Sequence, residues 1–438
     1  MKLRIFESAQ GDCLLLEGQD KKLVLCDGGM RSSIKSHVRD ELAKLRTKGR
    51  ELAFVYVSHI DSDHISGVLQ LLEDEVEWRV FDYQSSLPNG NPTKPDVPRP
   101  PVIKGLLHNS FRDQIGINTS TEVADLLAVA VPSLLATANF DLVNAALALQ
   151  DIAVSIPEAI EVSRLSASDA LDIPVNRIPG LTTTGKLLFF RSAAQSFKVG
   201  GMRFTIVGPG EQELTDLKTG WVNWLRDNKI RVRDLRRELK RRIDEFSNGT
   251  PGSPFDLGGW NGIPDFKQVT APNVASLMFM VEEDGKRLLL TGDSEQEKIL
   301  TGLQQTGFLG DQSLHVDVLK VQHHGSEHNM DPHFARQVSA DHYVFCGNGE
   351  NGNPNPEVID FVFNSRRGAP NERALAPVAN GRRFHFWFST TSAAQDPESG
   401  RHDAFKDLED HVEHLRQSSQ GQLVLHFNQA ASIELKIH

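Results

Sequence analysis

The chain has 438 residues, of which 39% are hydrophobic and 24% charged, and its formal net charge is −11. These values are typical of a folded protein, and the acidic balance argues weakly against general affinity for nucleic acid unless basic groups gather locally. The sequence has no apolar run of about 18 residues, so we expect no membrane span. Three scattered cysteines exclude a disulfide framework and a cysteine-based zinc site, and the start lacks the pattern of a signal peptide, so we expect a cytoplasmic protein.

Residues 1–83 alternate between strands and helices. "KLRIFES", "DCLLLEG" and "KLVLCDGG" predict short strands joined by turns, and "IKSHVRDELAKLRTKG" predicts a helix that ends at Gly49. "LAFVYVSH" predicts the next strand, "ISGVLQLLEDE" a helix and "EWRVFDY" another strand. This alternation indicates the first half of an α/β fold.

Residues 84–195 break that pattern. Residues 85–101 form a Pro-rich linker, and the Ala/Leu-rich stretch up to about residue 175 predicts several helices and no strand. We expect an inserted helical cap beside the functional site that restricts access for large substrates.

Residues 196–438 return to strands and complete the fold. "QSFKVGGMRFTIVGPG" predicts two strands, "MFMVEEDGKRLLL" a hairpin, and "HVDVLKV" and "DHYVFC" two further strands. "RRFHFWFST", "GQLVLHF" and "SIELKIH" are expected to be edge strands that complete the sheets.

One segment of this half concentrates positive charge. Residues 226–246 carry nine Lys or Arg residues in a pattern typical of a helix. An ordinary solvated helix face explains such a pattern, but the same residues would also form a phosphate-binding patch if the helix reached the site. The candidate substrate-binding residues are Arg233, Arg237, Lys240 and Arg241.

Candidate metal ligands follow the predicted strands. His59, Asp61, Asp63 and His64 lie directly after "LAFVYV", where a turn lets their side chains converge as two pairs of ligands. Imidazole and carboxylate together favour Zn, Mn or Fe. Further strand ends supply Asp293 in "LLLTGD", His323 and His324 in "VQHHGS", and Asp27 in "LVLCDGG", although Asp27 also suits an ordinary turn.

The motifs "SHIDSDHISG", "LLLTGDSE" and "LKVQHHGS" together resemble the metallo-β-lactamase fold. They are most similar to its competence-type branch, the hydrolase domain of bacterial DNA-uptake channel proteins, and Asp27, Asn273 and Ser276 also fit that branch. The resemblance covers residues 1–83 and about 196–360. It implies an αββα sandwich with two metals, Zn before Mn or Fe, between the sheet edges.

The resemblance also implies a role for each ligand. The first metal would take His59, Asp61 and one of His323 or His324; the second would take Asp63 and His64; Asp293 would bridge both; and Asp27 would orient a ligand. Where relatives place a histidine of the second site, this chain has "GNPNPE", so Asn353 or Asn355 implies a weak or empty second site. His108 is a further candidate ligand, although no predicted strand precedes it.

The chemistry expected of such a site is hydrolysis. Two cations would share and activate a bridging water, Asp63 would accept its proton, and the cations would stabilise charge on a phosphoryl or carbonyl oxygen. A phosphodiester or nucleic-acid substrate is the first hypothesis. The alternatives are a small ester, an amide or a phosphorylated metabolite as substrate, or a non-catalytic binding module that kept the fold.

Overall fold

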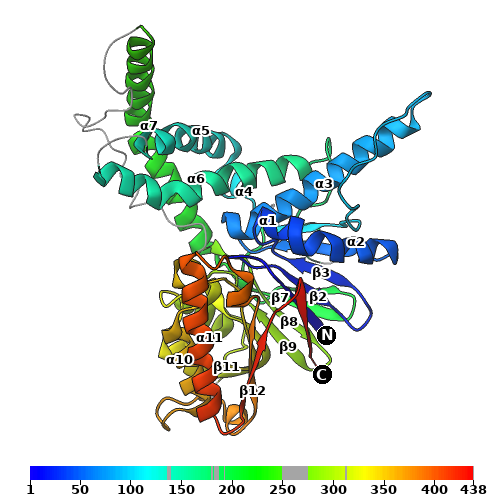
Figure 1. Ribbon diagram of the computed structural model, residues 1–438, viewed down its shortest axis with the longest axis vertical. Coiled ribbons are helices and arrows are strands. Elements are labelled where there is room, and N and C mark those ends of the chain that lie inside the picture. Colours follow the sequence, from blue (N-terminus) through cyan, green and yellow to red (C-terminus); the bar gives the residue numbers. More distant parts are fainter. Residues whose placement is uncertain are drawn as a thin grey trace.

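The computed structural model describes residues 1–135, 140–178, 181, 187–191, 193–248, 275–310 and 313–437, and in it two β-sheets face each other (Figure 1). The six-stranded sheet has the order β14-β1-β2-β3-β4-β5 and the eight-stranded sheet the order β13-β12-β11-β10-β9-β8-β7-β6. The strands of the first sheet are β1 Lys2–Phe6, β2 Leu14–Glu17, β3 Leu23–Cys26, β4 Leu52–Val57, β5 Leu106–His108 and β14 Ser432–Lys436. Those of the second are β6 Ser196–Val199, β7 Met202–Gly208, β8 Met278–Glu283, β9 Lys286–Leu290, β10 Leu314–Lys320, β11 Val338–Phe345, β12 Phe384–Phe388 and β13 Leu423–Phe427.

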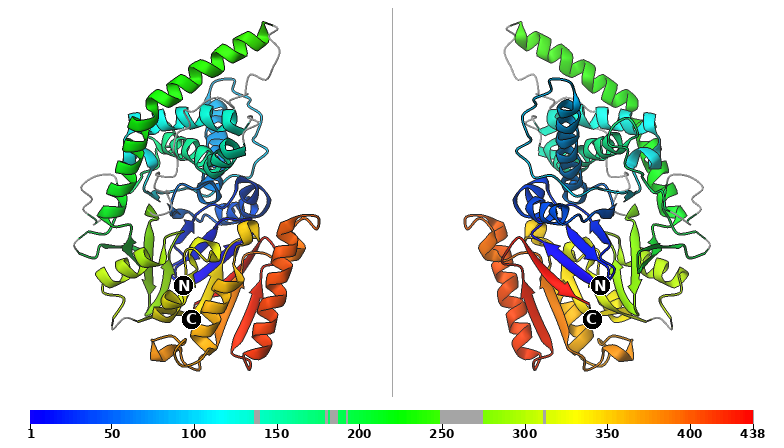
Figure 2. Two further views of the ribbon diagram at one scale, coloured as in Figure 1. Left: turned by 90° about the vertical axis from the view of Figure 1, so that its left-hand side faces the viewer. Right: turned by 90° about the vertical axis from the view of Figure 1, so that its right-hand side faces the viewer.

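Helices cover the outer faces of both sheets (Figure 2). The helices on the side of the first sheet are α1 Arg31–Ser33, α2 Arg39–Thr47, α3 Ser62–Ser86, α4 Phe111–Ile115, α5 Ile117–Leu135, α6 Phe140–Ser166 and α7 Glu211–Ser247. Those on the side of the second are α8 Gln296–Gln305, α9 Pro332–Gln337, α10 Pro356–Arg367 and α11 Gly400–Ser418. A π-helical turn, Ile34–Val38, joins α1 to α2.

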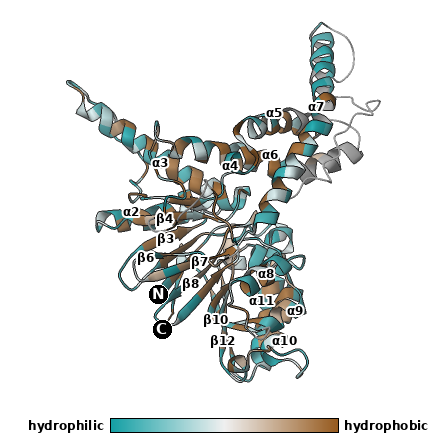
Figure 3. Ribbon diagram, turned by 180° about the vertical axis from the view of Figure 1, so that it is seen from behind, coloured by the Kyte–Doolittle hydropathy of each residue, from teal (hydrophilic) through white to brown (hydrophobic). Residues whose placement is uncertain are grey.

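The apolar strand runs are explained by burial on both faces. In β3, Val24 belongs to the cluster between the sheets, whereas Leu25 packs with the helices outside the first sheet. In β9, Leu288 lies between the sheets and Leu289 packs under the helices of the second sheet. Strands buried on both faces need apolar residues at successive positions. The predicted αββα sandwich is confirmed, and Figure 3 shows hydrophobic residues concentrated on its strands.

Three details of the sequence prediction are wrong. The segment "EWRVFDY" continues helix α3, because Trp78 is 8% exposed and its Nε1 donates to the Val97 carbonyl of the Pro-rich segment at 3.0 Å. The insertion contains a strand, β5, which pairs in parallel with β4. Strand β12 is not an edge strand, since β11 and β13 pair with its two sides.

The insertion packs onto the first half of the chain. Apolar residues of α5 and α6, including Leu127 and Ile156, form one cluster with Val55 of β4 and Leu71 of α3, and Trp221 of α7, which lies outside the insertion, joins it. These helices lie above one end of the sheets, and the outer half of α7 projects beyond them in both Figure 1 and Figure 2.

Pairing of β1 with β14 places the two ends of the chain side by side (Figure 1). Within the described ranges, none of the helices has the length and apolar character needed to cross a membrane. Cys13, Cys26 and Cys346 are buried and free, as their scatter in the sequence predicts.

Candidate metal centre

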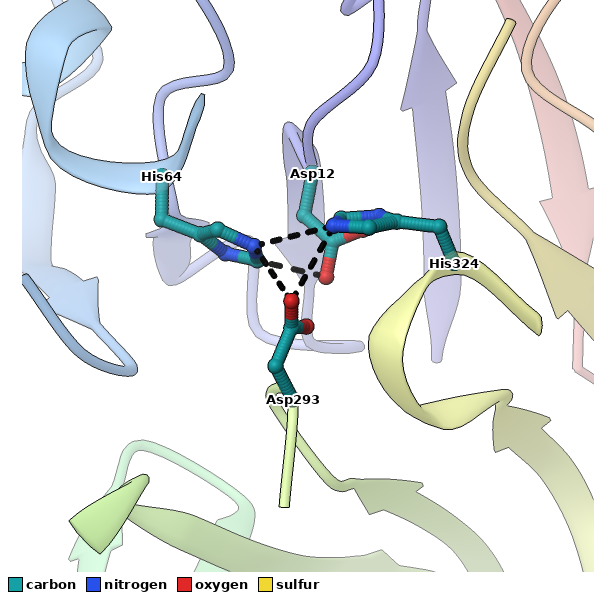
Figure 4. A group of neighbouring side chains, drawn as sticks. All are labelled: Asp12, His64, Asp293 and His324. Atoms are coloured by element: carbon teal, nitrogen blue, oxygen red, sulfur yellow. Dashed lines mark hydrogen bonds and ion pairs between the residues drawn. The ribbon is translucent and has the colours of Figure 1, made fainter. Parts of the chain in front are cut away.

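The predicted ligands meet because the loops that carry them follow the carboxyl ends of neighbouring strands. Asp27 follows β3, His59 follows β4, Asp293 lies just beyond β9, and His323 lies just beyond β10. β3 and β4 are parallel neighbours in the first sheet, as are β9 and β10 in the second. Figure 4 shows side chains from these loops pointing toward one another.

Glycines let the start of α3 approach the turn after β3. A Cβ atom added to Gly67 would lie 2.1 Å from the Gly28 carbonyl oxygen, and one added to Gly28 would lie 2.3 Å from the Val68 nitrogen. Backbone contact at this distance is possible only without side chains. It places His64, in the first turn of α3, directly beside Asp27.

The turn after β10 aims two adjacent histidines at one point. His323 and His324 have φ values of 47° and 56°, and Gly325 follows at 87°. The left-handed region is uncommon for residues other than glycine, and backbone in such sparsely populated regions clusters at functional sites. The tight turn lets two consecutive rings face the same carboxylate rather than opposite sides of a strand.

Four imidazoles converge on one oxygen atom, Oδ2 of Asp293. The distances from their Nε2 atoms to this oxygen are 3.1 Å for His324, 3.2 Å for His64, 3.8 Å for His323 and 3.9 Å for His59. Asp293 is 2% exposed. The structure therefore brings together both histidine motifs and the aspartate of the third motif.

Each of the four rings is held from its other side. The partners of the Nδ1 atoms are Asp27 for His64 at 3.0 Å, Asp12 for His324 at 3.1 Å, Asn329 for His323 at 2.6 Å and Ser58 Oγ for His59 at 2.9 Å. Metal-binding histidines commonly use the second nitrogen in this way, which fixes the ring and directs the free nitrogen to the metal. The role expected of Asp27 is thus matched by its geometry.

The donor atoms fit a divalent cation. The Nε2 atoms of His64 and His324 lie 3.3 Å apart, and Asp63 Oδ2 lies 3.2 Å from Nε2 of His324. Bonds of about 2.0 Å to a tetrahedral metal put its ligand atoms about 3.3 Å apart. Nε2 of His59 is buried without a hydrogen-bond partner in the described chain, 3.4 Å from Asp61 Oδ2. A bound cation would satisfy all of these groups.

The geometry divides the donors differently from the expected assignment. His324 lies beside Asp63 and His64, whereas Asp61 lies beside His59, and all four rings, including that of His323, approach Asp293. The set of Asp63 and His64 thus has two imidazoles. The second set was expected to lack a histidine because Asn353 stands at the corresponding position. His324 supplies that imidazole, and within the described chain Asn353 has no hydrogen bond to either set.

Two residues of the centre were not predicted from the sequence. Lys320 is 1% exposed; its Nζ contacts the Asp12 carboxylate and lies 3.4 Å from Asp293 Oδ1 and 3.1 Å from the Gly292 carbonyl oxygen. Burial acts to lower the pKa of Lys320, but Asp12 and Asp293 raise it above its usual range, so the ammonium stays charged. In the sequence, Asp12 begins the predicted strand "DCLLLEG" and Lys320 lies within the apolar run "HVDVLKV".

The carboxylates dominate the electrostatics of the centre. Burial lowers the pKa of His64 and of His324, but neighbouring carboxylates, Asp293 foremost, raise both well above the ordinary value. Burial raises the pKa of Asp63, and the opposing effect of these histidines brings it to about 2. Such a set attracts positive charge, and metal binding would release the protons held by the rings.

Several predicted residues do not join the centre. His108 is buried at the end of β5, outside the group of converging ligand atoms. In α7, Arg237 pairs with Asp234 at 3.4 Å and Arg241 pairs with Glu238 at 2.6 Å. Arg233 and Lys240 are exposed on the half of α7 that projects away from the sheets in both Figure 1 and Figure 2, and Asn273 lies outside the described residues.

An α/β sandwich with histidines and aspartates converging between its two sheets defines a candidate metal-binding domain. Residues 8–76 match the family model of the metallo-beta-lactamase superfamily, and the matched segment contains Asp12, Asp27 and the whole loop from His59 to His64. No curated protein matches the chain. The fold is therefore that of a metallo-β-lactamase domain, a superfamily of hydrolases that generally use divalent metals.

Proposed function

We propose that the protein is a metal-dependent hydrolase of phosphodiesters that uses two divalent cations, Zn first among them. The observation that carries this proposal is the convergence of four imidazole Nε2 atoms within 3.9 Å of Asp293 Oδ2. When bound, the cations supply Lewis acidity toward a phosphoryl oxygen and lower the pKa of a water molecule. Similarity of the motifs to the competence-type branch supports a phosphodiester over a carboxylic ester or an amide.

The side chains of the centre have distinct proposed roles. Asp293 directs Oδ2 toward the imidazoles, and its Oδ1 faces the Lys320 ammonium. The lysine thereby fixes the orientation of the carboxylate that the imidazoles share. Asp63 is the candidate proton acceptor, because its side chain is 23% exposed and an Asp63 oxygen lies beside the His324 ring. Asp12 and Asp27 hold rings in place and take no part in proton transfer to the substrate.

The surroundings favour a short substrate over a long polynucleotide. Helix α6 lies over the loop that carries the ligands, since Glu158 accepts a hydrogen bond from Ser62 at 2.8 Å and pairs with Arg31 at 3.6 Å. The basic residues of α7 are in part neutralised by acids on the same helix. A small phosphodiester, or the end of a nucleic-acid strand, is therefore the proposed substrate.

The test combines metal analysis with hydrolysis assays. Protein purified without chelator should hold about two equivalents of metal and cleave bis-p-nitrophenyl phosphate, with single-stranded DNA and RNA as further substrates. The variant Asp293→Asn should lose the metal and at least about a thousandfold of the activity, because it weakens both ligand sets at once. Asp403→Asn, at a side chain 83% exposed on α11, is the matched control and should behave as wild type.

The outcomes separate the hypotheses. Metal-free, inactive wild-type protein would overturn the enzyme and favour a binding module. Full metal content with hydrolysis of an ester or amide alone would replace the proposed substrate class.

A further inference from the structure

A polar cavity of about 530 Å3 lies inside the insertion, separate from the residues that converge on Asp293. It is open to solvent on one side and is lined by the end of β5, the start of α4, the end of α6 and the loop that follows it up to residue 177. Its volume is in the range of small-molecule binding pockets.

His108 lines this cavity and is 2% exposed. Neither of its ring nitrogens has a hydrogen bond of ordinary geometry to the described part of the chain. The backbone around the ring is by contrast fixed, since the Asn176 side chain accepts from the His108 amide at 2.9 Å and donates to its carbonyl at 2.7 Å. The ring does approach the Val57 backbone, but a buried polar ring without a hydrogen bond of ordinary geometry beside a cavity indicates room for a ligand.

The charged groups of the cavity indicate the kind of ligand. Arg112 and the exposed Arg177 both line it, together with the carboxylates of Asp113 and Asp172, and within the described chain neither guanidinium group has an ion pair or hydrogen bond. Unpaired guanidinium groups at one cavity favour a phosphate or carboxylate, which they bind through two parallel hydrogen bonds. This observation is independent of the buried histidine.

The remaining polar groups of the cavity can form hydrogen bonds with hydroxyl groups of a ligand. Ser163, Ser166 and Ser168 line the cavity with Asp172, and a carboxylate can only accept hydrogen bonds while a hydroxyl can donate and accept. Burial lowers the pKa of His108 to about 4, against the effects of Asp113 and the Val57 backbone. A neutral ring offers one donor and one acceptor, which suits a hydroxyl better than a second anionic group.

We propose that this cavity is a second ligand site, which binds a small phosphorylated polyol such as a sugar phosphate. The phosphate lies against Arg112 and Arg177, and the hydroxyls contact His108 and the serines. The site does not depend on the proposed hydrolase activity. It stands next to the metal centre, because β5 pairs in parallel with β4, with His108 opposite Val57, two residues before His59.

The test measures binding by the full-length, metal-containing protein. Ribose 5-phosphate, inorganic phosphate and ribose are titrated by calorimetry, and ribose 5-phosphate should bind more tightly than either of the others. The variants Arg112→Gln and Arg177→Gln should each weaken it by about tenfold to a hundredfold, the usual range for a lost hydrogen bond to a charged group. Arg164→Gln is the matched control, since Arg164 lies on α6 next to the cavity residue Ser163 but is 61% exposed and paired with Glu161.

A second measurement locates the ligand. With 13C-labelled histidine rings, the resonance that is absent in His108→Gln should shift in wild type when ribose 5-phosphate is added. Binding that is equally tight in both arginine variants would assign the ligand to the metal centre and overturn the proposal. Absence of binding by all three probes, or an unshifted His108 resonance, would overturn it too. Bis-p-nitrophenyl phosphate hydrolysis, retained in the arginine variants, checks that the metal centre is intact.

Discussion

Two groups of histidines on the same sandwich differ in what surrounds them. At the metal centre, four rings point one nitrogen at Asp293 and are held from behind by other polar side chains. On β11, β12 and β13, the second group consists of His342, His385 and His426, which we call the distal triad. Its rings face each other, with Nδ1 of His385 2.9 Å from Nε2 of His426.

The difference indicates that the carboxylates, more than the histidines, distinguish the candidate metal centre from the distal triad. Trp387 donates to Nδ1 of His342 at 3.1 Å and stacks on His426 at 3.8 Å between ring centroids, so aromatic and imidazole groups satisfy the distal triad. Burial, aided by a neighbouring histidine, lowers the pKa of His342 and of His426 to about 4. The pKa shifts of His64 and His324 at the centre are therefore opposite in sign to those of the distal triad.

The largest expected effect concerns the charge balance of the centre. Lys320→Met would leave Asp12 and Asp293 buried without the ammonium, and breaking a buried ion pair from one side costs about 3 kcal/mol or more. We expect a lower free energy of unfolding by that amount, measured by denaturant titration. Lys320→Arg retains the charge and should recover part of it. A methionine variant as stable as wild type would show that the lysine does not balance the centre.

The second prediction concerns the orienting carboxylates. Asp27→Asn keeps the shape but weakens the hold on Nδ1 of His64, and loss of such a partner typically lowers metal affinity by about tenfold to a hundredfold. Competition with a chromogenic chelator measures the affinity. Asp360→Asn, at the partner of His411 on the surface, is the control for removing an aspartate beside a histidine. Equal affinity in all three proteins would remove Asp27 from the centre.

The convergence of the candidate ligands could be predicted from the sequence because most of them follow a strand. The apolar run "LAFVYV" followed by His59 and Asp61 predicts candidate ligands at a strand end, and this prediction does not depend on the rest of the chain. Asp12 and Lys320 were not predicted because their roles depend on contacts between distant parts of the chain. Asp12, for example, is 312 residues from its partner His324. The strand β5 was missed because three residues, Leu106–His108, are too few to show a pattern, and they become a strand only by pairing with β4.

The same reasoning explains the error at "EWRVFDY". Its β-branched and aromatic residues favour a strand in isolation. The helix that begins at Ser62 nevertheless continues through it, because Trp78 is buried against the Pro-rich segment. The sequence also leaves open which of the adjacent histidines lies beside Asp63 and His64, because the direction of each ring is set by the left-handed turn that carries both.

The third prediction uses the lowered pKa values of the distal triad. In the unfolded chain these histidines take up protons near pH 6.5, whereas in the folded chain His342 and His426 stay neutral down to about pH 4 and burial lowers the pKa of His385 as well. The unfolded state then binds more protons, so this part of the stability is present above pH 6.5 and is lost as the pH falls toward 4. Replacing all three with Gln should reduce the fall in the unfolding midpoint between pH 7 and pH 5 by about 3 °C. An identical fall in both proteins would contradict it. Asp341 and Arg383 face the triad in both proteins, so their effect cancels.

The smallest expected effect tests whether one carboxylate can turn the distal triad into a metal site. Val424 lies opposite His385 in the pairing of β12 with β13 and is half-buried, so Val424→Asp would place a carboxylate beside two imidazoles. His385 and His426 are already within contact distance of each other, and a mixed imidazole and carboxylate set suits Zn. We expect one additional weak equivalent of Zn, seen by equilibrium dialysis. Val424→Asn adds a side chain of equal size without the charge and should bind none. If the aspartate and asparagine variants bind the same amount of Zn as wild type, a carboxylate beside two imidazoles is not sufficient for a metal site. The candidate metal centre would then depend on the hydrogen bonds that orient its rings through Nδ1 as much as on Asp293.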